Sequence, residues 1–186
     1  MKRLLNNTLL NKFFNNLFMN IHPLFVHFPI GILVLYTAFE IFRFSFIINR
    51  HSYFEIKTIL VIIGTITAYL SASTGDMAEK VIKITDPTKM PLVEIHSLYA
   101  GLTITVFSLL ASAYLIEWCK RNNILEIITK IKVLYQMVTI ILKLSPLLAF
   151  IGLVTITITG ALGAAIVYGQ NVDPVVNFIY RMFSGL

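Results

Sequence analysis

Three histidines stand at points where long apolar stretches of the chain begin. His22 and His27 belong to the segment His-Pro-Leu-Phe-Val-His-Phe-Pro at residues 22–29, and His96 has the same relation to a later stretch. An ionisable side chain left unpaired in hydrocarbon is costly, so each of these histidines is a candidate functional residue. Imidazoles also supply the axial ligands of many haem irons. The chemistry to consider is therefore metal or haem binding inside a membrane.

The spacing of His22 and His27 argues against a compact metal site that uses both side chains. Five residues at about 100° per residue turn the second ring roughly 140° away from the first. Imidazoles suit zinc, copper and iron alike. A metal site formed by His22, His27 and Asp76 would nevertheless need a break in the helix between the two histidines. We therefore predict that His27 pairs with His96 from another helix. The alternative is that each histidine bonds a backbone carbonyl across helices.

The elements that carry these histidines are predicted to be membrane-spanning helices. The 186 residues are 57% hydrophobic with a mean hydropathy of +0.81, which is too apolar for a soluble domain. A span needs about 20 apolar residues and must satisfy its own backbone hydrogen bonds, which favours the α-helix. Four segments meet this requirement: residues 24–48, 56–74, 92–116 and 144–168. The predicted fold is an all-α transmembrane four-helix bundle.

This arrangement brings two of the histidines to the same depth. With four spans, the first and third helices start from the same face of the membrane. His27 lies three residues after Leu24 and His96 lies four residues after Leu92, which puts both about 5 to 6 Å below the boundary. Two imidazoles at equal depth on different helices fit axial ligation of one iron.

Two prolines are predicted to shape the first helix. Proline is favoured at the first helical position, so Pro23 predicts that the helix starts there and that His22 lies at the water boundary. Pro29 removes one helical hydrogen bond and is predicted to open the helix around His27. Such a distortion would aim the imidazole of His27 into the bundle.

Small residues and one carboxylate complete the candidate site. Gly160 and Gly163, on the fourth span, would leave room for a macrocycle, although plain helix packing explains small residues equally well. Asp76 ends the second span on the histidine side and could orient an imidazole. The alternative for Asp76 is a loop residue in water.

The rest of the chain predicts membrane attachment and topology. Residues 1–20 carry an apolar stripe and predict an amphipathic helix lying on the membrane, and residues 21–186 form the single bundle domain. The charged segment 122–143 is not counted as a span, since each charge near the bilayer centre would cost about 2.5 to 3.5 kcal/mol. The net charge of +6 is spread over loops and span ends, so we expect contact with the lipid bilayer and no nucleic-acid binding. The lone Cys119 rules out an intrachain disulfide and offers no thiolate site by itself.

A slight excess of Lys and Arg places the first and third loops in the cytoplasm. The histidine end then faces the outer side of a bacterial inner membrane, or of an organellar inner membrane.

Four sequence motifs follow one another along the chain: Ile-His-Pro-Leu-Phe-Val-His-Phe-Pro-Ile-Gly at 21–31, Ser-Thr-Gly-Asp at 73–76, His-Ser-Leu-Tyr-Ala at 96–100 and Thr-Gly-Ala-Leu-Gly-Ala-Ala-Ile-Val-Tyr-Gly at 159–169. In these motifs the chain resembles the DUF2231 family of small prokaryotic four-helix membrane proteins. The chain departs from the family pattern in its long N-terminal arm and in the residues between Gly160 and Gly163. The resemblance implies a haem-binding or redox role, with His27 and His96 as ligands. It implies that His22 is an alternative ligand or a partner for a haem propionate.

Together these features predict a membrane protein that binds haem b through two histidines. We expect it to transfer electrons between a quinol or a small redox protein and a respiratory complex, as an accessory subunit more than as a stand-alone enzyme. The alternative, favoured by the absence of any complete catalytic set, is a non-catalytic structural or assembly subunit of a larger membrane complex.

Overall fold

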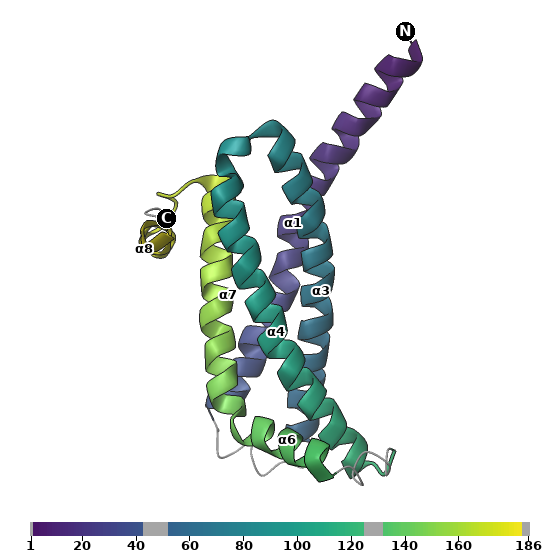
Figure 1. Cartoon of the computed structure of the whole chain (residues 1–186), viewed down its shortest axis with the longest axis vertical. Helices are drawn as coiled ribbons and strands as arrows, with labels where there is room; N and C mark the ends of the chain where they lie inside the picture. The colour runs from purple at the N-terminus through teal and green to yellow at the C-terminus, as the bar shows by residue number, and fades with distance from the viewer. Residues whose placement is uncertain (1, 43–51, 125–131, 184–186) are drawn as a thin grey trace.

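The computed structural model describes residues 2–42, 52–124 and 132–183, with side chains described from residue 22 onward, and every element in these ranges is helical (Figure 1). The elements in chain order are α1 (Lys2–Ile41), α3 (Tyr53–Thr85), the short 3-10 helix η1 (Pro87–Lys89), α4 (Met90–Arg121), α6 (Lys132–Lys143), α7 (Ser145–Tyr168) and α8 (Pro174–Phe183).

Four of these helices are long and apolar enough to cross a bilayer. Their apolar segments are His22–Ile41, Tyr53–Thr85, Pro87–Arg121 and Ser145–Tyr168. The all-α bundle with four spans is thus confirmed, and the chain is an integral membrane protein. The second helix is longer than the expected 56–74, while positions 43–48 of the expected first span lie outside the described residues. Large apolar side chains on the outer surfaces, such as Ile59, Ile66 and Phe150, are exposed as a lipid-facing surface requires.

The N-terminal segment is helical but is not a separate element. Residues 2–41 form one continuous helix that contains Pro23 and Pro29, so the prediction that the first helix starts at Pro23 is wrong. Figure 1 shows the first half of α1 projecting away from the bundle. The expected placement of residues 1–20 on the membrane surface stays a prediction.

Among the described residues, the short helices α6 and α8 lie outside the four spans. α6 ends at Lys143, and α7 begins with Ser145 and Pro146, whose ring suits a first helical turn. A break at Leu144 therefore separates the two helices. α8 was not predicted; Asp173 caps its first turn by accepting bonds from the Val175 and Val176 amides at 2.8 and 2.9 Å.

The core runs along the inside of the bundle. α1 packs against α3, and α4 packs against α7. The largest side chains that are fully enclosed between the four helices are Tyr36, Phe107, Leu33 and Leu110. Tyr36 packs edge-on against Phe107, with ring centroids 6.2 Å apart. This close packing sets the separation of the helices at both ends, where the polar residues lie.

Candidate histidine site

The His22 ring is held by the end of α3. Its Nδ1 lies 2.9 Å from the Thr74 hydroxyl oxygen, and the backbone of Ser71 also interacts with the ring. The Thr74 hydroxyl donates its one proton to the Ser71 carbonyl at 2.7 Å, which leaves its oxygen free only to accept. The hydrogen-bond network therefore assigns the Nδ1 proton to His22, and Nε2 of the neutral ring keeps the lone pair.

The His96 ring is held by α7 in a comparable way. Its Nδ1 lies 2.9 Å from the backbone carbonyl oxygen of Thr159. Because a carbonyl can only accept, His96 is also the Nδ1–H tautomer when neutral. Its Nε2 is then the atom available to a ligand.

Each imidazole rests against a glycine of the neighbouring helix. A methyl group placed on Gly75 would come within 3.2 Å of His22 Cε1, and one placed on Gly163 would come within 3.1 Å of His96 Cε1. Both distances are shorter than ordinary van der Waals contact, so a side chain at either glycine would displace the ring. Gly163 therefore lies directly under the His96 ring, and its expected role of leaving room for a macrocycle stays a prediction.

The two imidazoles lie at the same end of the bundle. This is the end where α3 connects to α4 and where α7 turns into α8 (Figure 1). His22 and His96 are both partly enclosed at this end. Of the two histidines in the first motif, the structure encloses His22, whereas the expected ligand was His27.

The remaining candidate residues lie elsewhere. His27 is exposed on the outer surface of α1, and Pro29 does not turn it inward because α1 stays helical through both prolines. Asp76 is exposed as well, so the hydrogen bond that orients His22 comes from Thr74 instead. A methyl group added to Gly160 would meet no side chain within 4 Å, and this glycine lines a shallow groove on the outside of α7.

A second polar centre lies at the opposite end of the bundle. The Glu40 carboxylate, only 1% exposed, accepts bonds from Lys57 Nζ at 2.9 Å and from the hydroxyls of Tyr114 and Ser145, both at 2.6 Å. These four residues come from α1, α3, α4 and α7. The Tyr36 hydroxyl lies close to Glu40 and Tyr114 but makes no well-formed hydrogen bond within the described part of the chain. One buried carboxylate therefore ties all four spans together.

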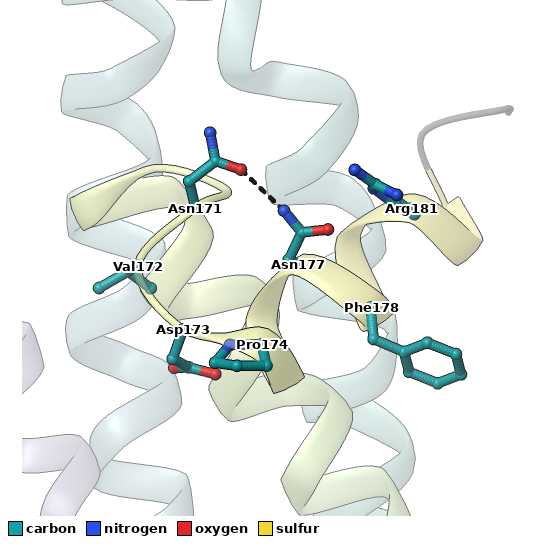
Figure 2. Close-up of a pocket in the computed structure, with 7 residues that line it drawn as sticks. All are labelled: Asn171, Val172, Asp173, Pro174, Asn177, Phe178 and Arg181. Atoms are coloured by element: carbon teal, nitrogen blue, oxygen red, sulfur yellow. Dashed lines mark hydrogen bonds between the residues drawn. The ribbon is translucent and has the colours of Figure 1, made fainter.

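A surface depression lies at the turn between α7 and α8, at the same end of the bundle as the histidines. It holds about 500 Å³. Figure 2 shows its lining side chains around this turn, with Asn177 donating to Asn171 at 2.7 Å. It is open and shallow, and none of the three candidate histidines lines it.

Comparison with known proteins assigns the family. The family profile described as "Predicted membrane protein (DUF2231)" matches residues 19–175. The chain belongs to the DUF2231 family. No curated protein and no solved structure matches the chain. The matched range contains every residue of the histidine site and of the Glu40 cluster.

Two site residues of this DUF2231 protein were missed from the sequence. Thr74 and Thr159 both lie inside motifs that carry the family resemblance, but a threonine in an apolar helix is common and carries no signal of its own. The dipeptide Thr-Gly occurs at 74–75 and again at 159–160, but it does not mark equivalent positions of the two histidine contacts. In the second copy, the glycine that seats the ring is Gly163 and not Gly160.

Proposed function

We propose that this DUF2231 protein binds a b-type haem, whose iron Nε2 of His22 and Nε2 of His96 would hold. The observation that carries the proposal is the shared tautomer. Histidines that bind metals commonly donate the other ring N–H to a carbonyl or similar acceptor, which fixes the ring and raises its basicity. The hydrogen bonds at Nδ1 of His22 and His96 have this form.

The composition of the site favours a haem over a bare metal ion. A structural zinc site takes four protein ligands and a catalytic one takes three. Within the described residues, no group of three or more His, Cys, Asp or Glu side chains could hold a metal ion. A haem needs only two axial ligands from the protein, because the macrocycle supplies the other four. Two imidazoles at one end of the bundle match that requirement.

The residues of the chain would supply orientation and a low dielectric. The hydrogen bonds to Thr74 and Thr159 hold the two rings, and the apolar helices around them exclude water. A haem bound here would provide reversible one-electron chemistry, with a potential set by its axial ligands and by its burial. The proposed role is therefore electron transfer within a respiratory or similar membrane, with a quinol or a small redox protein as the partner. The charge bias of the loops favours an orientation with this end toward the outer side of an inner membrane.

The test is the absorption spectrum of the full-length protein purified from haem-replete cells. We expect a Soret band, a pyridine haemochrome of haem b, and a low-spin spectrum. His22→Ala and His96→Ala should each abolish the low-spin form, whereas the matched control His27→Ala should leave it unchanged. A colourless preparation of folded protein would refute the proposal. Loss of the spectrum in His27→Ala alone would refute the assignment of ligands.

A further inference from the structure

The two helix pairs of the bundle, α1–α3 and α4–α7, carry their contact residues at corresponding positions. The segment Ile-His-Pro-Leu-Phe at 21–25 corresponds to Ile-His-Ser-Leu-Tyr at 95–99. Leu33 follows His22 on α1 by about three helical turns, and Phe107 follows His96 on α4 by the same separation. Because whole turns return to the same side of a helix, the two residues of each pair lie on one face.

On the partner helices α3 and α7, which run antiparallel to α1 and α4, two glycines have the same spacing. Gly75 follows Gly64 on α3 by this separation, and Gly163 follows Gly152 on α7 by it as well. Leu33 packs on Gly64, just as Phe107 packs on Gly152. The histidine of each pair lies on the second glycine, three turns away. Each half is thus an antiparallel pair of helices in which one large apolar side chain and one histidine ring each pack on a glycine of the partner helix.

Smaller contacts follow the same correspondence. The Thr67 hydroxyl donates to the Gly64 carbonyl at 2.9 Å, and the Thr155 hydroxyl donates to the Gly152 carbonyl at 2.9 Å. The backbone positions that meet the two histidine rings, at residues 71 and 159, are also equivalent. The contacts of Leu33, Phe107 and the two histidine rings with glycines lie within the α1–α3 and α4–α7 pairs, which are the most extensively packed helix pairs of the bundle.

The correspondence between the two helix pairs distinguishes His22 from His27. The residue of α4 that corresponds to His27 is Gly101, and both positions are exposed. The residue that corresponds to His22 is His96. Only one histidine of the first motif therefore has a counterpart in the other half of the molecule.

We infer that the protein consists of two equivalent helical hairpins, α1–α3 and α4–α7, that form one ligand site between them, to which each contributes one imidazole seated on one glycine. The ligand class this requires is a centre that accepts an imidazole on each of two opposite faces, such as the iron of a planar macrocycle. The identity of that ligand rests on the proposed function; the paired construction of the site does not. Gly75 and Gly163 are positioning residues, and their effects should be matched.

The experiment is solid-state NMR of the full-length protein in lipid bilayers, with ¹⁵N-labelled histidine and without haem. At about pH 8, above the ordinary histidine pKa of about 6.5, the signals of His22 and His96, identified by their loss in the alanine variants, should both report the Nδ1–H tautomer. Gly75→Ala should shift only the His22 signal, and Gly163→Ala only the His96 signal, by similar amounts. Gly160→Ala, where a methyl group has open space, is the matched control and should shift neither.

Haem is then added as the probe ligand. We expect both signals to change together and to reach their end point at one haem for each chain. If haem does not bind but the tautomers and the glycine responses are as stated, the paired site is supported and the haem proposal fails. An Nε2–H tautomer at either histidine, a response to only one of the two glycine substitutions, or a response of the His27 signal to haem would overturn the inference.

Discussion

Replacing Glu40 with glutamine should destabilise the bundle because it leaves a buried ammonium without its counter-charge. Lys57 Nζ lies 2.9 Å from Glu40 Oε2, and the two side chains are 10% and 1% exposed. At an effective dielectric constant of about 20, the attraction at this distance is about 6 kcal/mol before desolvation is subtracted. Glutamine keeps the shape and an acceptor oxygen, so the loss is mainly that of the charge.

Two effects set the size of the net cost. Breaking a buried ion pair by removing one partner typically costs about 3–5 kcal/mol. Lys57 lies four residues into α3, about 6 Å from its start at 1.5 Å per residue, and part of the cost is recovered as its flexible side chain moves toward water. In the variant the Lys57 ammonium would also retain its cation–π contacts with the Tyr53 and Tyr114 rings, whose centroids lie 4.9 and 5.3 Å from Nζ. We therefore expect about 3 kcal/mol for Glu40→Gln.

The assay is reversible unfolding in bicelles, read by steric trapping or by far-UV circular dichroism in SDS. Tyr114→Phe and Ser145→Ala each remove one hydrogen bond to the carboxylate and should cost only about 0.6–1.7 kcal/mol, the range measured for bonds between membrane helices. Removing both charges in Glu40→Gln/Lys57→Met should be less harmful than the sum of the single substitutions. A loss below about 0.5 kcal/mol for Glu40→Gln, or strict additivity in the double variant, would refute the reasoning.

Two further predictions concern packing and a surface carboxylate. Gly152→Ala should cost about 1–3 kcal/mol because its methyl group would overlap the Phe107 ring, whereas the control Gly101→Ala has open space and should leave stability within about 0.5 kcal/mol; equal effects of the two substitutions would contradict this packing. The hydrogen bond from the Thr88 hydroxyl holds the pKa of Asp86 below its ordinary value, so this carboxylate contributes stability above its unfolded pKa that is lost as the pH falls through the folded pKa. Thr88→Ala should move the pKa of Asp86 upward in a ¹³C NMR titration, and an unchanged titration would exclude the hydrogen bond as the cause.

The fold was largely predictable because membrane spans are read from length and hydropathy alone. The prediction that the helix starts at Pro23 was wrong because a proline inside a helix removes only one hydrogen bond. Transmembrane helices tolerate that loss, and α1 continues through Pro23. The same error made His22 a boundary residue, although its ring is held against α3. Depth along the helix can be counted from sequence, but the side of the helix that faces the core depends on its packing partners.

The Glu40 cluster could be seen only in part. The sequence contains an acid at Glu40 and a base at Lys57 near the ends of consecutive spans, but nothing in the spacing joins them to Tyr114 and Ser145. Those contacts depend on tertiary packing between positions far apart in the chain. Sequence periodicity reports the faces of single helices and does not report which faces meet.

The two equivalent hairpins carry different side chains at the Glu40 end of the bundle and the same side chain, histidine, at the other end. In the common register Glu40 corresponds to Tyr114 and Lys57 corresponds to Ser145, because each lies at the same separation from the histidine or the second glycine of its own helix. Identical halves would bury two carboxylates and two ammonium groups side by side, and the desolvation of four charges exceeds what their attraction returns. Tyr114 and Ser145 instead donate neutral hydrogen bonds to a single carboxylate. At the other end, two neutral imidazoles carry no such penalty, so identity of the halves is tolerated there and suits a ligand that is bound from both faces.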